Sequence, residues 1–228
     1  MLKITDRIGL LITKTSGMDS LELCLDKKHF KNYPKKITYQ YNSRGFRDAE
    51  WPEDLSDVIW CVGDSFTVGI GQPAEEAWPQ LLEKKTGKRC LNLGEDGCSN
   101  DSIALRIQEI YKLYDPKLIV AMWSFLHRRR VNGKNVQYDI KDFNNEADLT
   151  NFLSNFDKTN KLPIKILHTT IPNIFWNEQM LYIANKKTNS KLILYKQLDR
   201  ARDYHHFDIK TSEYICDLII QKIKNFDF

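Results

Sequence analysis

Short apolar runs alternate along the chain with longer segments in which apolar residues recur every three or four positions. Five of the runs have the length and the composition that are typical of strands. They are DVIWCVG at 57–63, CLNLG at 90–94, KLIVAMWS at 117–124, IKILHTT at 164–170 and KLILY at 191–195. Because these runs are nearly continuous in apolar residues, we expect buried strands of a parallel sheet.

Three segments between and after these runs have helical periodicity. They are EEAWPQLLEKKTG at 75–87, SNDSIALRIQEIYKLYDP at 99–116 and TSEYICDLIIQKIKNF at 211–226. The first ends at Gly87, which is typical of a helix C-terminus, and either Ser99 or Asn100 can cap the second. The alternation of strands with helices predicts an α/β fold in which helices cover both faces of a parallel sheet.

Two parts of the chain fit this alternation less well. Within the first 56 residues, YNSRGFRDAEWPEDL has the Asn, Gly and Pro content of turns, so we expect a preamble that packs beside the sheet. Residues 130–161 are rich in Asn, Asp and Lys and predict a surface excursion. The expected organisation is a preamble at 1–56 and a main domain at 57–228, together one globular unit.

The composition excludes several classes of protein. The chain has 228 residues, of which 42% are hydrophobic, and this is enough for the core of a single domain. Its 34 basic and 30 acidic side chains give a net charge of +4, which is modest for a nucleic-acid-binding protein, so no nucleic-acid partner is expected. The longest apolar runs are far shorter than the roughly 20 residues of a membrane-spanning helix. We therefore expect no membrane span.

The cysteines and the N-terminus bear on the compartment and on cofactors. Five cysteines are an odd number, and none has the spacing of a metal site, which predicts free thiols. The apolar patch IGLLI follows Asp6 and Arg7 and is followed by no small-residue cleavage site, so we expect no signal peptide and a cytoplasmic location. Neither a phosphate-binding loop nor a GxGxxG motif is present, and no metal or other cofactor is expected.

A candidate nucleophile follows the first expected strand. Ser65, in WCVGDSFTVGIG, lies at the carboxyl edge of the sheet, where ligand sites of such folds are found. A hydroxyl needs a base to lose its proton, and His205 and His206 lie between the last strand and the last helix, near the same edge. Asp203 precedes His206 by three residues, a spacing that can bring a carboxylate to the imidazole. Ser65, His206 and Asp203 are therefore a candidate catalytic triad.

These motifs resemble those of the SGNH hydrolases, also called GDSL-type esterases. GDS at 63–65 follows a hydrophobic strand, NLGEDGCSN at 92–100 follows the second strand, and a DxxH motif ends at His206. With NSRGFRD at 42–48 included, the resemblance extends from about residue 42 to the C-terminus. It implies a flavodoxin-like three-layer α/β/α sandwich with about five parallel strands.

The resemblance also implies a reaction, the hydrolysis of an ester through an acyl-serine intermediate. Carried over to this chain, Ser65 is the nucleophile, His206 the general base and then acid, and Asp203 its orienting partner. The backbone N–H groups of Ser65 and Gly97 are the implied oxyanion hole, and a glycine suits that position because substrate oxygen can approach its backbone. His205 is the alternative base, although the spacing in the family favours His206.

The third family motif, GxND, is where the chain departs from the pattern. Ser124 aligns with the glycine, Leu126 with the asparagine and His127 with the aspartate. Loss of one such oxyanion donor typically lowers turnover by about 10² to 10³. The residues considered as substitutes are Asn100, Ser124, His127 and Arg128. Arg128 begins a run of three arginines, and we expect this residue or a neighbour to contribute to the substrate pocket.

The expected function is that of a serine esterase, acting on a small-molecule or carbohydrate ester with a short acyl group such as acetyl. Two alternatives stay open. One is an acyltransferase on the same fold, in which a sugar hydroxyl replaces water as the acceptor. The other is a binding module in which the altered third motif has ended catalysis. The sequence does not indicate an oligomeric state.

Overall fold

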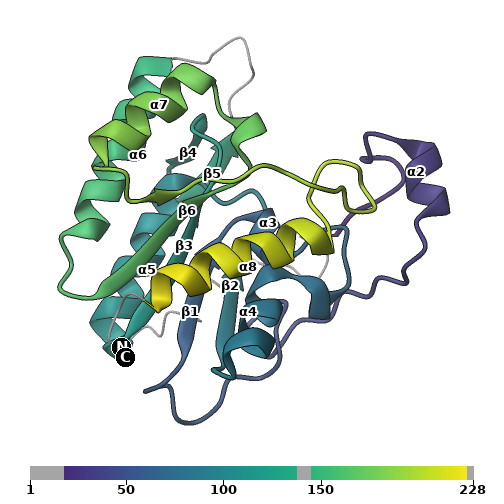
Figure 1. Cartoon of the computed structure of the whole chain (residues 1–228), viewed down its shortest axis with the longest axis horizontal. Coiled ribbons are helices and arrows are strands. Elements are labelled where there is room, and N and C mark those ends of the chain that lie inside the picture. Colours follow the sequence, from purple (N-terminus) through teal and green to yellow (C-terminus); the bar gives the residue numbers. More distant parts are fainter. Residues whose placement is uncertain (1–17, 138–144, 225–228) are drawn as a thin grey trace.

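A five-stranded parallel sheet forms the centre of the computed structural model, which describes residues 18–137 and 145–224 (Figure 1). Its strands are β1 (Ile59–Gly63), β2 (Cys90–Gly94), β3 (Leu118–Trp123), β6 (Lys165–Thr170) and β7 (Leu192–Ile193). Their order is β2-β1-β3-β6-β7, and every neighbouring pair is parallel. This is the flavodoxin-like order of a doubly wound sheet, and it confirms the expected fold class.

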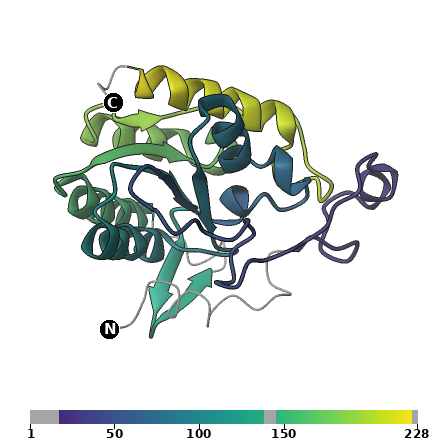
Figure 2. The same cartoon turned by 90° about the horizontal axis from the view of Figure 1, so that it is seen from below.

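Helices cover both faces of the sheet (Figure 2). The long helices are α4 (Trp78–Thr86), α5 (Asn100–Tyr114), α6 (Asn145–Asn160), α7 (Glu178–Lys187) and α8 (Ile209–Ile223). α4 packs against α8 on one face, whereas α5 packs against α6 on the other, and α7 packs on α6. The result is the three-layer α/β/α sandwich that the resemblance implied.

The local signals in the sequence explain where two of these helices begin and end. α4 ends at Gly87, which has a φ of 70°, in the left-handed region that favours glycine. α5 begins after Ser99, whose side chain accepts a hydrogen bond from the backbone N–H of Ser102. Both termini lie where the sequence predicted them.

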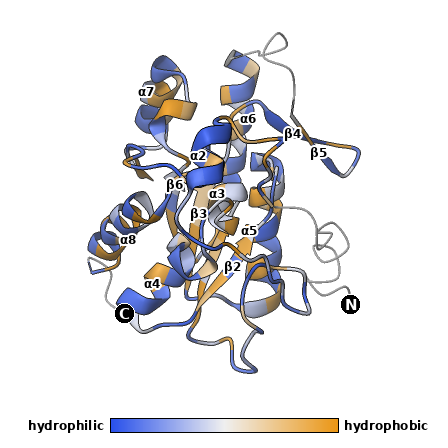
Figure 3. Ribbon diagram, turned by 90° about the vertical axis from the view of Figure 1, so that its right-hand side faces the viewer, coloured by the Kyte–Doolittle hydropathy of each residue, from blue (hydrophilic) through white to orange (hydrophobic). Residues whose placement is uncertain are grey.

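The core lies on both sides of the central strands, whose residues are the most hydrophobic part of the ribbon (Figure 3). Every residue of β1, β2 and β3 is buried, as expected for a parallel sheet between two helical layers. The largest side chains without solvent contact include Trp60, Trp78 and Trp123. Burial of such aromatic side chains contributes strongly to the stability of a domain.

The expectation of a surface excursion at 130–161 is wrong for its second half. The segment begins with an antiparallel hairpin of β4 (Arg128–Val131) and β5 (Lys134–Gln137), but it continues into α6, which belongs to the helical layer. Leu149, Phe152 and Phe156 are buried along one side of α6 because they recur at helical spacing. The abundant polar residues conceal this short apolar stripe. Residues 138–144 lie outside the described part of the chain.

The N-terminal segment, residues 18–56 of the described chain, contains the short helix α2 (Lys27–Asn32). Three further short helices complete the described structure, α3 (Ser65–Val68), η1 (Ala74–Glu76) and η3 (Asn173–Phe175). α2 has no buried residue and lies away from the sheet, beside the loop that precedes α8 (Figures 1 and 2). His29 of α2 reaches that loop, with its Nε2 atom 3.0 Å from the carbonyl oxygen of Ala201.

Candidate active site

Ser65 is the first residue of α3 and follows β1 after a single residue, Asp64, at the carboxyl edge of the sheet. Asp64 caps the helix, because one of its carboxylate oxygens accepts a hydrogen bond of 3.1 Å from the backbone N–H of Phe66. β2 approaches α3 so closely that a Cβ atom on Gly94 would lie 2.4 Å from the backbone nitrogen of Val68. The neighbouring strand therefore fixes the position of α3 and of Ser65 at its start.

His206 lies opposite Ser65, in the loop that precedes α8. Its Nε2 atom is 2.8 Å from Ser65 Oγ, and its Nδ1 atom is 2.5 Å from Asp203 Oδ2. An ionised carboxylate only accepts hydrogen bonds, so Nδ1 carries a hydrogen and Nε2 accepts the hydroxyl hydrogen of Ser65. The three side chains thus lie in the order that the serine, histidine and aspartate of a catalytic triad have.

Asp203 is held in its ionised form by its hydrogen bonds. Its second oxygen accepts from the backbone N–H groups of His205 and His206, both at 3.0 Å. Burial alone would raise the pKa of Asp203, but the hydrogen bonds from the His206 side chain and from the two N–H groups lower it to about 2. At neutral pH the carboxylate is therefore available to stabilise a protonated His206.

His205 points into a different environment from His206. Its ring stacks on Phe125, with an angle of 13° between the planes, and lies 5.0 Å from the ring of Phe175. Burial and the neighbouring His206 lower the pKa of His205 to about 4, so it is neutral at pH 7. Phe125, Phe175 and His205, all partly exposed, are called the aromatic cluster below. The structure brings His206 to Ser65, as the family spacing predicted.

A buried ion pair lies at the start of α3. Arg128 Nη1 is 3.0 Å from Asp64 Oδ2, and the same oxygen accepts a hydrogen bond of 2.5 Å from the hydroxyl of Ser124. Burial raises the pKa of Asp64, whereas Arg128 and Ser124 act in the opposite direction. The guanidinium also packs over the ring of Phe125, 4.5 Å from its centroid. Arg128 therefore lies within the site region but is bonded to the protein.

The other substitutes considered for the missing asparagine are also engaged. Asn100 accepts a hydrogen bond of 2.8 Å from the backbone N–H of Ser124 and donates to the carbonyl oxygens of Ser124 and Phe125. These bonds fix the backbone directly after β3. His127 is partly buried beside Phe125, and its pKa is lowered to about 4 by burial and by the neighbouring arginines. Leu126 packs against the core.

Gly97 lies in the loop between β2 and α5 with a φ of 67°, which a residue with a side chain rarely adopts. A Cβ atom there would meet nothing within 4 Å, so the space on that side of the backbone is open. The neighbouring Cys98 is fully buried, and burial raises the pKa of its thiol. A protonated, inaccessible thiol is a poor nucleophile, so Cys98 serves packing.

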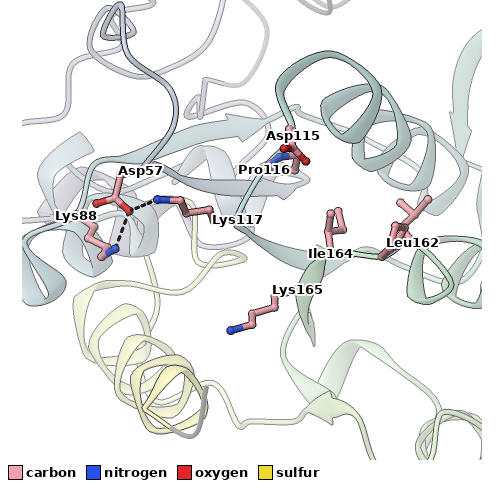
Figure 4. A pocket seen from close by; sticks show the side chains of 9 residues that line it. Asp57, Lys88, Asp115, Pro116, Lys117, Leu162, Ile164 and Lys165 are labelled. Carbon is pink, nitrogen blue, oxygen red and sulfur yellow. Dashed lines mark hydrogen bonds and ion pairs between the residues drawn. The ribbon is translucent and has the colours of Figure 1, made fainter. Parts of the chain in front are cut away.

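A pocket of about 680 Å³ lies at the opposite edge of the sheet (Figure 4). It is lined at the amino ends of the strands by residues that include Asp57, Lys88, Lys117 and Lys165. Two lysine side chains converge on Asp57, at 2.8 Å for Lys88 and 3.5 Å for Lys117. None of the candidate catalytic residues lines this pocket, which belongs to the edge remote from Ser65.

Residues 18–137 and 145–224 also bear on metal sites, membrane spans and disulfides. In these ranges no group of three or more His, Cys, Asp or Glu side chains is arranged to hold a metal ion. None of the helices described there combines the length and the apolar surface needed to cross a bilayer. All five cysteines are buried free thiols.

Comparison with known proteins gives matches of structure but not of sequence. No family model matches the chain, and no curated protein matches it. The psychrotrophic esterase EstA from Pseudoalteromonas sp. superposes with a TM-score of 0.51 at 18% identity, over 75% of this chain and 98% of EstA. A lipolytic G-D-S-L protein from Veillonella parvula DSM 2008 gives a TM-score of 0.51 at 17% identity, over 74% and 99% of the two chains.

A carbohydrate esterase has a similar fold. The family two carbohydrate esterase from Clostridium thermocellum, in complex with cellohexaose, superposes with a TM-score of 0.53 at 14% identity. The match covers 78% of this chain and 66% of that one. At such low identities the likeness concerns the fold, and the chain has the SGNH hydrolase fold that its motifs predict.

Proposed function

We propose that this protein is a serine esterase in which Ser65, His206 and Asp203 form the catalytic triad. The observation that carries the proposal is the hydrogen-bonded row from Ser65 Oγ to His206 Nε2 and from His206 Nδ1 to Asp203. The three residues come from the start of α3 and from the loop before α8, and 141 positions separate Ser65 from His206. Such an alignment is the geometry that activates a serine hydroxyl.

The proposed reaction has two halves. Ser65 Oγ attacks the carbonyl carbon of the ester while its proton passes to His206 Nε2, and Asp203 stabilises the imidazolium that forms. The ester C–O bond then breaks, and His206 gives the proton to the leaving alcohol, which leaves an acyl group on Ser65. Water attacks this acyl-serine with His206 again as the base, and the carboxylic acid is released. The backbone N–H groups of Ser65 and Gly97 are the proposed donors to the oxyanion.

A sugar ester with a short acyl group is the proposed substrate class. The aromatic cluster adjoins the base, since the rings of His205 and His206 are 4.9 Å apart and Phe175 follows at 5.0 Å from His205. Partly exposed aromatic faces offer a surface on which a sugar ring can pack. The similarity of fold to a carbohydrate esterase bound to cellohexaose agrees with this class.

A panel of p-nitrophenyl esters and acetylated sugars tests the proposal. The acetyl ester should be hydrolysed faster than longer acyl esters, acetate should be released from an acetylated sugar, and Ser65→Ala should abolish both activities. Equal rates for the wild type and Ser65→Ala would refute the triad, and a preference for octanoyl esters would refute the short acyl group. Formation of an acetylated acceptor in place of acetate would identify an acyltransferase.

The binding module is the second candidate, and the altered third motif favours it. The side chain of Leu126 cannot donate a hydrogen bond where the family has an asparagine, and the neighbouring side chains of Asn100, Ser124 and Arg128 are bonded to the protein. For such a module, an acetylated sugar should bind without release of acetate. Isothermal titration with the same sugar, followed by assay of the mixture for acetate, separates binding from turnover.

A further inference from the structure

Asp19, in the N-terminal segment, has a carboxylate with no exposed surface (0%). The carboxylate accepts two hydrogen bonds from Arg202, of 2.6 Å from Nε to Oδ2 and 2.7 Å from Nη2 to Oδ1. It accepts a third, of 2.5 Å, from the hydroxyl of Tyr39. A bidentate pair between arginine and a buried carboxylate fixes distance and orientation together, because both groups are planar and both bonds must align.

The two partners of Asp19, Arg202 and Tyr39, also form hydrogen bonds close to the candidate active site. Arg202 directly precedes Asp203, and its backbone N–H donates a hydrogen bond of 2.8 Å to the carbonyl oxygen of Gly71. The hydroxyl oxygen of Tyr39 accepts a hydrogen bond of 2.9 Å from the backbone N–H of Gly71. Gly71 lies three residues after the end of α3. Through Tyr39 and Arg202, Asp19 therefore links the segment after α3 to the segment before Asp203.

The segment after α3 and the segment before Asp203 are in close contact where they meet. A Cβ atom on Gly71 would lie 2.9 Å from Ala201 Cβ and 3.2 Å from Asp203 Oδ1. The N-terminal segment also holds the carbonyl oxygen of Asp203, through a hydrogen bond of 3.0 Å from the backbone N–H of Leu25. The loop that contains Asp203 and His206 is thus bonded to residues of the N-terminal segment as well as to the loop after α3.

We infer that Asp19, Tyr39 and Arg202 form a clasp that sets the distance between Ser65 and His206. They are positioning residues and make no contact with the reacting atoms. The inference rests on the proposed function, because a set distance matters where Ser65 must pass a proton to His206. Ser65 and His206 belong to separate segments of the chain, and a misplacement of about 1 Å in an active site can lower the rate about 100-fold. The N-terminal segment thereby gains a role in catalysis that no family motif assigns to it.

Asp19→Asn and Tyr39→Phe test the clasp, with Glu50→Gln as the matched control. The control removes a carboxylate of the same segment whose described hydrogen bonds are to Ser43. Either clasp variant should lower kcat about 10- to 100-fold with little change in KM, whereas Glu50→Gln should keep the wild-type kcat. The double variant should be no slower than the slower single variant, because both break the same chain of hydrogen bonds. Arg202→Lys should retain more activity than Arg202→Met.

Hydrogen exchange followed by mass spectrometry supplies a readout without substrate. In Asp19→Asn the backbone amides of 69–72 and 199–206 should exchange faster, while those of α5 should not change. Unchanged exchange in both loops would overturn the clasp, and so would a wild-type kcat despite faster exchange. Because exchange needs no turnover, it decides whether Asp19 holds the loops even if the wild type hydrolyses no ester. A wild type that hydrolyses no ester would refute the proposed function, but it would not refute the clasp.

Discussion

Arg128 and Asp64 form a buried ion pair, with 3.0 Å between Nη1 and Oδ2, and Asp64 immediately precedes the candidate nucleophile. Removal of one partner leaves the other charge buried and uncompensated, which typically costs about 3–5 kcal/mol. Arg128→Met should therefore lower the free energy of unfolding by about that amount in urea titrations at pH 7. The double variant Arg128→Met/Asp64→Asn should recover part of the loss. A double variant less stable than Arg128→Met would contradict this account.

Gly94 should tolerate no side chain, because a Cβ atom there would lie 2.4 Å from the backbone nitrogen of Val68 in α3. Gly94→Ala should destabilise the protein by about 1–3 kcal/mol, as overpacking does, and should also lower esterase activity by displacing α3. Gly87→Ala is the control, since a Cβ atom at Gly87 meets nothing within 4 Å and only its φ of 70° opposes the change. Thermal unfolding and ester assays of both variants check the prediction. A fully active Gly94→Ala would show that β2 does not position the nucleophile.

The sheet was predictable from the sequence because buried parallel strands are continuous apolar runs. The five expected strands are the five of the central sheet, and their flavodoxin-like order is the one that the family resemblance implied. α6 was missed because its stripe of Leu149, Phe152 and Phe156 lies in a segment dominated by Asn, Asp and Lys. Periodicity is weak evidence where only three apolar positions mark a helix.

Only those parts of the candidate site that lie near the ends of strands could be predicted from the sequence. Ser65 and His206 lie in segments that the winding brings to one edge, and the DxxH spacing places Asp203 beside His206. The pairing of Arg128 with Asp64 joins residues 64 positions apart, and Asp19 bonds Arg202 across 183 positions. No local pattern encodes such a pair, because the partner is chosen by the packing of the whole domain.

The two adjacent histidines should differ sharply in their contribution to activity. His206→Gln removes the base that contacts Ser65 and should lower kcat by about 10²- to 10⁴-fold. His205→Gln removes a ring that stacks on Phe125, so it should mainly raise KM for a sugar ester. Steady-state kinetics of both variants on one acetylated sugar checks the assignment. The reverse pattern would transfer the role of base to His205.

The stability contributed by Asp203 should depend on pH. Its pKa in the folded protein, about 2, lies below the ordinary value of 3.8, so the folded state favours the ionised form. This contribution, about 2 kcal/mol, is present above roughly pH 4 and is lost as the pH falls through 2. Asp203→Asn should therefore be less stable than the wild type at pH 7 and nearly equal to it at pH 2. Urea titrations across this range measure the difference, and a constant difference would contradict the low pKa.

The central claim is that the His206–Asp203 pair makes Ser65 a nucleophile. Intact-mass analysis after treatment with a fluorophosphonate tests it most directly, because such reagents form a stable bond with an activated serine. We predict one adduct on the wild type, located at Ser65 by peptide mapping, and none on Ser65→Ala or after unfolding in urea. A folded wild-type protein that acquires no adduct, or that acquires it at another residue, would contradict the claim.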